Sequence, residues 1–237
     1  MSVMMMIGRA GVQSYQNQVN VVSNNIANIN TNGFKKNDVV FKDLIHVEQD
    51  LPLMNGAEQP ETFNQGFGVR SDYVYENFNQ GALITTGNLN NMAISGEGFF
   101  AVRDAQTQQV YLTRDGSFSL DREGVLVDSL GNRVVTQVIE NEDGTTSEMP
   151  LLYRPNQTAN MTKVSQNYYA VDPDNLVSEL DNPEWFGKIE SGVLEGSNVD
   201  LATEMTNLMV ANRAYSMNLK SIQKADETME LINQLKR

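Results

Sequence analysis

Apolar residues recur every three or four positions near the start of the chain, which is typical of one face of a helix. These positions are Val12, Tyr15, Val19, Val22, Ile26 and Ile29. Their alternating spacing of three and four is a heptad seam, which winds one helix face against a partner helix. The turn residues Asn-Thr-Asn-Gly at 30–33 predict that this helix ends there.

A second seam runs through the C-terminal segment and predicts a helix over about 198–235. Its positions are Leu201, Met205, Leu208, Asn212, Tyr215, Leu219, Ile222, Asp226 and Met229. Ser197, with Asp200 three residues later, resembles a capping box at the start of this helix. Two readings of the polar positions Asn212 and Asp226 stay open. They fix the register inside the seam, or the apolar stripe rotates and both face solvent.

The middle of the chain reads as short strands separated by turns. β-branched and aromatic runs occupy 98–102, 109–113, 117–120, 124–127 and 133–139, with Gly-containing turns between them. This pattern predicts an antiparallel meander with one face on a core. The segment 48–70 is rich in Pro, Gly, Gln and Glu and has weak periodicity, so it is expected to be an extended loop.

These patterns predict an α+β fold, in which long N- and C-terminal helices form a coiled-coil stalk beside a mainly β, antiparallel middle domain. Proline and glycine agree, because all six prolines lie between Pro52 and Pro183, and neither residue occurs after Gly196. The expected domains are an N-terminal helix plus turn (1–42), an extended linker or loop (43–80), a β-rich outer domain (81–192) and a C-terminal helix (193–237).

Charge is distributed unevenly along the 237 residues. The segment 43–200 carries eight basic and 25 acidic groups, a net charge of -17, whereas both ends are nearly neutral. This acidity argues against nucleic acid as a partner. The polar face of the first predicted helix is almost uncharged and consists of Gln, Asn and Ser. Such a face suits burial against other chains, since amides both donate and accept hydrogen bonds. A merely solvated polar face is the alternative.

Candidate catalytic chemistry is sparse. The chain has no cysteine and a single histidine, His46, which excludes a disulfide framework, a thiolate metal site and a histidine-rich metal site. Gly96-Glu-Gly98 lacks the third glycine of a phosphate loop. The acidic pair Asp121 and Glu123 flanks a predicted turn, which favours a surface role over acid–base catalysis.

The remaining candidate sites have simpler readings. The acidic cluster Glu140, Glu142 and Asp143 does not have calcium-loop spacing, and Asp143-Gly144 suits a hairpin turn. Sequons at Asn156 and Asn160 are common by chance. The apolar run Val3–Ile7 is too short for a membrane span or a signal-peptide core. No catalytic residue, metal ligand or cofactor site is therefore predicted.

Three segments, taken together, resemble the bacterial flagellar rod and hook protein family. The first is Ser23-Asn-Asn-Ile-Ala-Asn-Ile-Asn-Thr-Asn-Gly-Phe-Lys35, with Asn32 where proline is common. The second is Met92-Ala-Ile-Ser-Gly-Glu-Gly-Phe-Phe-Ala-Val102, followed by Thr-Arg-Asp-Gly-Ser-Phe at 113–118. The third is Leu194-Glu-Gly-Ser-Asn-Val-Asp200 with Asn-Arg-Ala-Tyr at 212–215. The segment 140–190 matches poorly. Within the family, the chain looks most like the rod proteins of distal or proximal type.

The resemblance implies a structural subunit of the flagellar basal-body rod, not an enzyme. It would polymerise into a helical tube that transmits torque and encloses the export channel. The implied partners are further copies of the chain, other rod and hook proteins, and the flagellar export apparatus, with no small-molecule substrate. The implied location is the basal body outside the cytoplasm, reached without a cleaved signal peptide. The alternatives are a hook or other axial subunit, or a surface adhesive module oligomerised by coiled coils.

Residues of both seams and of the family motifs are the candidate assembly residues. They are Val12, Tyr15, Val19, Val22, Asn24, Asn25, Ile26, Asn28, Ile29, Gly33, Phe34, Ser197, Asn198, Val199, Asp200, Leu201, Met205, Leu208, Arg213, Tyr215, Leu219 and Ile222.

The two ends lack the apolar surface for a core of their own, so we expect them to be disordered in a monomer and to order on assembly. Amide hydrogen exchange of the monomer should show unprotected ends and a protected middle. Strong protection over 12–29 in a monodisperse monomer would contradict this expectation.

Overall fold

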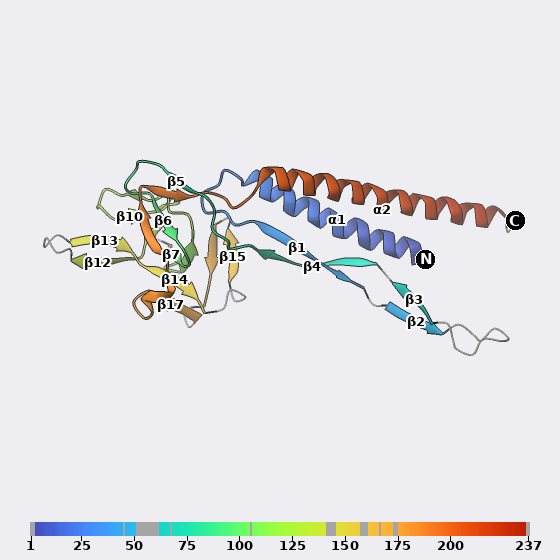
Figure 1. Cartoon of the computed structure of the whole chain (residues 1–237), viewed down its shortest axis with the longest axis horizontal. Coiled ribbons are helices and arrows are strands. Elements are labelled where there is room, and N and C mark those ends of the chain that lie inside the picture. Colours follow the sequence, from blue (N-terminus) through green and yellow to red (C-terminus); the bar gives the residue numbers. More distant parts are fainter. Residues whose placement is uncertain are drawn as a thin grey trace. The chain divides into compact units, whose positions relative to one another are not determined.

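The computed structural model describes residues 3–44, 46–50, 62–66, 68–104, 106–140, 146–156, 161–165, 167–172 and 175–235. The chain divides into two compact units. The helical unit comprises Met1–Ala27, Asn37–Asn77 and Asp200–Arg237, and the head comprises Asn28–Lys36 and Phe78–Val199. Long helices at both ends of the chain and an antiparallel β middle confirm the α+β class (Figure 1).

Two antiparallel helices, α1 (Val3–Ala27) and α2 (Leu201–Leu235), pack side by side in the helical unit (Figure 1). Glycines on α1 allow the helices to approach closely. A Cβ atom on Gly8 would lie 2.7 Å from the Ile222 side chain, and one on Gly11 would lie 2.7 Å from the Asn218 amide. A larger residue at either position would force the helices apart.

A β-ribbon packs on α1 in the same unit. Strands β1 (Asn37–Asp43) and β4 (Val69–Glu76) pair antiparallel, with a bulge beside Val40 and Phe41. The hydroxyl of Ser14 on α1 donates to the Val69 carbonyl at 3.2 Å and accepts from the Ser71 amide at 3.1 Å. The packing supports the ribbon, because an isolated two-stranded ribbon is marginally stable.

The prediction of an extended loop over 48–70, inside the expected linker 43–80, is wrong for the residues that the structure describes. Strands β2 (His46–Asp50) and β3 (Thr62–Gly66) form an antiparallel pair there, and β4 begins at Val69. Residues 51–61 lie outside the described part of the chain. Backbone pairing needs no apolar alternation, so the periodicity of this polar segment gave no strand signal.

The predicted seams are rotated from the faces that the helices bury. Among the described residues of α1 the buried positions are Gly8, Gly11, Ser14, Val22 and Asn25, and of these only Val22 belongs to the predicted seam. On α2 the buried residues are Glu204, Ala211 and Ala225. Small residues allow close approach but carry little hydrophobic signal, and this explains the misplaced faces.

The polar seam positions of α2 follow from this rotation. Asn212 and Asp226 are both exposed, so the rotated-stripe alternative holds within the chain. Leu201, Met205 and Leu219, which the pattern placed in the seam, are exposed as well.

The helix ends differ slightly from the predicted ones. Helix α1 ends at Ala27, before the turn residues at 30–33. The capping box expected from Ser197 is wrong, because Asp200 itself caps α2 by accepting from the amides of Ala202 at 3.4 Å and Thr203 at 3.2 Å. The Ser197 hydroxyl instead accepts from the amide of Val199.

The head is built of short strands. Their bounds are β5 (Leu83–Thr85), β6 (Met92–Ser95), β7 (Phe99–Arg103), β8 (Val110–Thr113), β9 (Ser119–Leu120), β10 (Leu126–Val127), β11 (Arg133–Val134), β12 (Thr136–Glu140), β13 (Thr146–Pro150), β14 (Leu152–Pro155), β15 (Thr162–Ser165), β16 (Tyr168–Ala170), β17 (Leu176–Ser178), β18 (Lys188–Ser191) and β19 (Val193–Glu195), with a 3-10 helix, η3, at Pro183–Trp185.

Strand β7 is the centre of the largest sheet. The order β15-β16-β8-β7-β11-β10-β9 places β7 between β8 and β11, and β14 pairs with both β7 and β17. All these pairs are antiparallel. The predicted meander is therefore correct for β7–β8 and for β9–β10–β11, but β11 returns to β7.

Both faces of β7 are covered, since its alternate residues enter two different apolar clusters. Phe100 and Val102 join one cluster, and Phe99 and Ala101 join the other. The first cluster also contains Met92, Ile94, Phe118, Leu126, Val134 and Leu152. The strands β18 and β19 pair with β6 and β5, so the end of the head returns to its beginning.

Truncating the centre of this core should destabilise the head. Phe100 is completely buried and stacks edge to face on Phe118, with ring centroids 5.1 Å apart. We expect Phe100→Ala to lower the free energy of unfolding by about 3–5 kcal/mol. The matched control Leu120→Ala, at an exposed position of β9, should change it by less than about 0.5 kcal/mol. Urea denaturation followed by near-ultraviolet circular dichroism measures both, and equal effects would show that the core lies elsewhere.

Candidate functional site

The head closes around three charged side chains that are almost completely buried. Lys35, Arg114 and Glu195 are 1%, 5% and 1% exposed. The Lys35 ammonium lies 2.7 Å from one carboxylate oxygen of Glu195, and the Arg114 guanidinium lies 3.3 Å from the other. One carboxylate therefore pairs with two cations in the interior, and we call these three residues the ion cluster.

Three segments far apart in the sequence position this ion cluster. Lys35 follows the turn after α1, Arg114 follows β8, and Glu195 ends β19. Gly33 has a φ of +67°, and its amide donates to the Glu195 carbonyl at 2.7 Å. A Cβ atom at Gly33 would lie 2.6 Å from the Arg114 backbone. Only glycine fits this left-handed turn and its close approach to the Arg114 backbone.

Lys35 and Glu195 have further hydrogen-bond partners in the backbone, whereas the buried Nε of Arg114 has no hydrogen-bond partner among the described residues. Lys35 also donates to the Asn79 carbonyl at 2.9 Å, and the Glu195 carboxylate accepts from the Gly81 amide at 2.8 Å. This satisfies polar groups whose burial would otherwise be costly.

The Arg114 guanidinium is held on two sides. It donates to the Gly96 carbonyl at 3.0 Å, and its central carbon lies 5.1 Å from the centroid of the Phe99 ring. Gly96 and Gly98, read as part of a failed phosphate loop, have φ values of +123° and +127° and form the turn that presents this carbonyl.

Burial makes the ion cluster dependent on its carboxylate. Desolvation lowers the pKa of Lys35 and the pKa of Arg114, and the charge of Glu195 opposes that lowering at both sites. Removing this charge would leave two buried cations with no counter-charge in the cluster.

Asn198 joins two further segments of the head by hydrogen bonds. The Asn198 side chain accepts from the Lys36 amide at 2.7 Å and donates to the Asn79 carbonyl at 2.9 Å. Phe34 is buried, and the Lys163 ammonium lies 5.4 Å from the centroid of its ring. Asn198 and Phe34, which were predicted to be assembly residues, therefore make contacts within the head of their own chain.

In the helical unit, Asn25 has a similar role. Its amide donates to the buried Glu204 carboxylate at 2.9 Å and to the Asn37 carbonyl at 2.8 Å, and its oxygen accepts from the Asn37 amide at 3.0 Å. The contact joins α1, α2 and the start of β1.

The other predicted assembly residues fall into three groups by exposure. Buried are Val22, Asn28, Gly33 and Val199, in addition to Asn25 and Phe34. Partly exposed are Val12, Tyr15, Val19, Ile26, Ile29, Ser197, Asn198, Leu208, Tyr215 and Ile222. Exposed are Asn24, Asp200, Leu201, Met205, Arg213 and Leu219.

The sequence analysis assigned no role to the buried charged residues Lys35, Arg114, Glu195 and Glu204. A signal was available for three of them. Each of the three motif segments contributes one member of the ion cluster, in Gly33-Phe-Lys35, Thr113-Arg-Asp115 and Leu194-Glu-Gly196. The presence of one such charged residue in each of the three motifs could have indicated that the three charges meet.

The acidic candidates occupy surface positions where they are described. Glu123 forms an exposed ion pair with Arg133 at 3.0 Å, and Asp121 accepts from the Gly124 amide in a turn. Glu142, Asp143, Asn160 and the side chains of His46 and Glu140 lie outside the described part of the structure. Over the described ranges, no group of acidic or histidine side chains could hold a metal ion, and no helix is long and apolar enough to cross a membrane.

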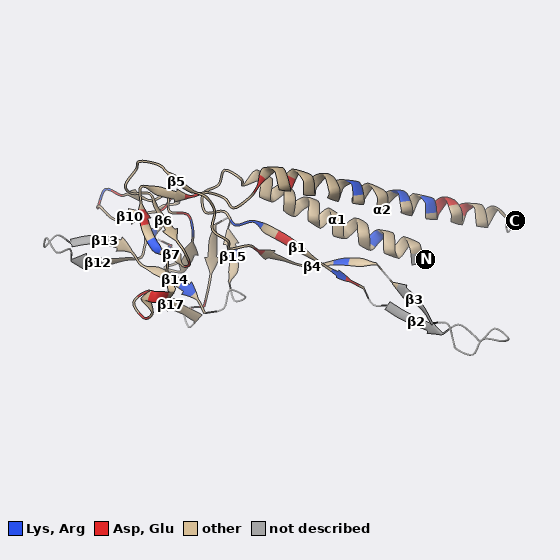
Figure 2. Ribbon diagram, viewed as in Figure 1, with Lys and Arg blue, Asp and Glu red and all other residues tan. Residues whose placement is uncertain are grey.

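Charge is nearly absent from α1, where Arg9 is the only charged residue (Figure 2). Three buried charges that bind one another, and a first helix whose polar surface is almost uncharged, are features of a structural subunit.

Comparisons with known proteins agree with this class and give the family. Residues 5–35 match the family model "Flagella basal body rod protein", 93–167 match "Flagellar hook protein FlgE/F/G D1 domain", and 190–235 match "Flagellar basal body rod FlgEFG protein C-terminal".

Curated relatives match along nearly the whole chain. The flagellar basal-body rod protein FlgG of Agrobacterium fabrum is 34% identical, covering 96% of this chain and 97% of its own. FlgG of Borreliella burgdorferi is 31% identical, with 96% of each chain covered. The rod protein FlgF of Caulobacter vibrioides is 31% identical, covering 95% of this chain and 93% of its own. The chain belongs to the flagellar basal-body rod protein family.

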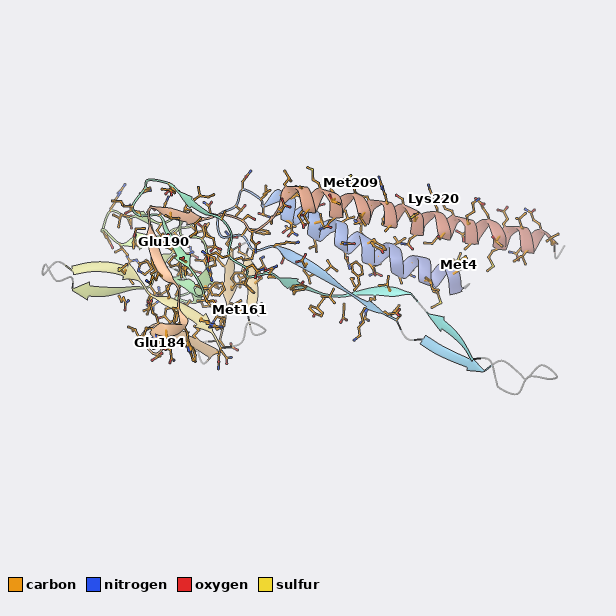
Figure 3. All side chains as sticks on the ribbon, in the orientation of Figure 1. Met4, Met161, Glu184, Glu190, Met209 and Lys220 are labelled. Atoms are coloured by element: carbon orange, nitrogen blue, oxygen red, sulfur yellow. The ribbon has the colours of Figure 1, made fainter. Side chains whose placement is uncertain are left out.

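Neutralising the shared carboxylate should destabilise the head strongly. We expect Glu195→Gln to cost about 3–5 kcal/mol in the free energy of unfolding, because both buried cations lose their counter-charge. Glu190→Gln is the matched control at an exposed position of the head (Figure 3) and should change it by less than about 0.5 kcal/mol. Urea denaturation measures both. Equal small effects would show that the ion cluster contributes nothing to stability.

Proposed function

We propose that this rod subunit polymerises through its two terminal helices into a helical tube, which transmits torque and encloses the export channel. The single observation that carries the proposal is the surface of the helical unit. Helix α2 exposes many apolar side chains, and α1 exposes uncharged amide side chains.

The apolar part lies on α2. Helix α2 buries its small residues against α1, but Val210 is 58% exposed and Met217 is 69% exposed. Further exposed apolar residues on this helix are Leu201, Met205, Met209, Leu219, Met229, Leu231, Ile232 and Leu235. So many exposed apolar side chains on one element indicate an interaction surface. A second copy of the chain is the occupant that a homopolymer provides.

The polar part lies on α1 and is almost uncharged. Gln13, Gln16 and Asn20 are exposed, and the Gln16 amide donates to the Asn20 oxygen at 3.2 Å. An amide can donate to or accept from the same group on an identical chain, whereas like charges repel. This composition supports packing among copies more than it supports a solvated surface.

We also propose that α1 and α2 form an antiparallel coiled-coil stalk within each subunit. Their contact runs from Gly8 beside Ile222 to the Asn25–Glu204 hydrogen bond, which supports this arrangement. In this scheme the buried assembly residues stabilise the stalk and the head of their own chain, and the exposed ones contact neighbouring copies.

The partners and the location follow from the family. We propose other rod and hook proteins and the flagellar export apparatus as partners, and a place outside the cytoplasm reached without a cleaved signal peptide. We favour the distal rod type over the proximal type, because the relatives in Agrobacterium and Borreliella, at 34% and 31% identity, are both FlgG, while FlgF and FlgG of Caulobacter match about equally, at 31% and 29%.

A charge on the exposed face of α2 should block assembly without unfolding the chain. We expect Val210→Asp to abolish swimming when it replaces the native gene, because a carboxylate without a partner in a packed interface costs several kcal/mol. Leu130→Asp is the matched control, since Leu130 is an exposed apolar residue of the head. The control should retain motility and complete rods in electron micrographs.

Two measurements make this test decisive. Circular dichroism of both purified variants should match the parent, which separates failed assembly from failed folding. Antibody labelling of hook–basal bodies should place the chain along the rod, at a height that separates distal from proximal. Complete rods with Val210→Asp, or label on the hook alone, would contradict the proposal, and a small closed oligomer found elsewhere would favour the adhesive module.

A further inference from the structure

Methionines are distributed between the two units in an unusual way. Six of them are exposed by 41% to 69%, and all six lie on the terminal helices. They are Met4, Met6, Met205, Met209, Met217 and Met229. In the described part of the head, Met92 is buried at 9% exposure, and Met149 and Met161 are partly covered.

The placement coincides with the surface proposed for assembly. Figure 3 shows Met209 projecting from α2 on the side away from α1, and Met4 in the first turn of α1. Thioether side chains are flexible and polarisable, which suits contacts with several inequivalent neighbours. The same property makes them oxidisable, and the chain has no cysteine to react first.

We propose that these six methionines are modification sites for a hydroperoxide, and that their oxidation to sulfoxide prevents association with a second copy of the chain. The proposal rests on the proposed function, because it requires that the helix faces become buried between copies.

The chemistry is a two-electron oxygen transfer. The thioether sulfur attacks the outer oxygen of hydrogen peroxide, the O–O bond breaks, and an S–O bond forms. The sulfur is oxidised, the peroxide is reduced, and water leaves with both peroxide protons. No group of the protein is needed beyond an accessible sulfur.

The consequence differs between the two units. A sulfoxide replaces an apolar contact with a strong acceptor, which is costly to bury unless it finds a donor. One buried sulfoxide should therefore weaken association about tenfold. The head should keep its fold, because the surrounding core limits peroxide access to Met92.

Peptide mass spectrometry tests the order of oxidation in the purified full-length chain. The chain is treated with hydrogen peroxide in native buffer and sampled over time. We expect the peptides of the six exposed methionines to gain oxygen first and the Met92 peptide to gain it last. Adding denaturant before the peroxide should abolish this order. Equal rates without denaturant would overturn the proposed sites.

Sedimentation velocity tests the effect on association of the same samples. Oxidised chain should associate at least about tenfold more weakly than untreated chain, and methionine sulfoxide reductases A and B should restore it. A variant with the six exposed methionines replaced by leucine should associate equally before and after peroxide, since leucine conserves volume and has no sulfur.

The outcomes separate this inference from the function on which it rests. Undiminished association of the oxidised chain would overturn the inference and leave the rod function intact. Untreated chain that shows no association, together with a Val210→Asp strain that still builds rods, would overturn both. Loss of association that the reductases do not reverse would also count against the inference, because it would place the damage outside methionine.

Discussion

The head depends on one buried carboxylate that neutralises two buried cations. Glu195 pairs with Lys35 at 2.7 Å and with Arg114 at 3.3 Å, and the three groups come from three segments of the chain. Because a buried charge without a partner is far more costly than an exposed one, the segments that carry these groups must lie together in the folded head. The turn after α1 and the strand before α2 are therefore parts of the head and not flexible connections to it.

The helical unit follows the opposite principle. The fully buried positions where its helices approach are mostly small residues, such as Gly8, Gly11, Ala211 and Ala225, whereas many of the larger apolar side chains of α2 are exposed. A soluble monomer normally buries its large side chains and exposes its small ones. The inverted arrangement leaves exposed the surface that would gain most from burial, while the acidic middle segment carries the chain's negative charge.

The sequence was sufficient for the broad fold, and the reasons for its failures are physical. The two helices, the antiparallel strands and the family followed from periodicity, glycine placement and three motifs. The packed faces of the helices did not, because Gly8 and Ala211 carry little hydrophobic signal despite their burial. The ion cluster did not either, because Lys35 and Glu195 are 160 residues apart and nothing local links them. The pair β2–β3 was missed because its polar strands show no alternation.

The same separation of 160 residues has a consequence for the order in which the chain becomes available to fold. A ribosome, or any narrow passage that the chain enters N-terminus first, releases Lys35 long before Glu195. Until Glu195 emerges, Lys35 has no counter-charge with which it could be buried, and the head lacks strand β19. Folding of the head is therefore delayed, because a partly emerged chain cannot form the ion cluster and only a nearly complete chain can.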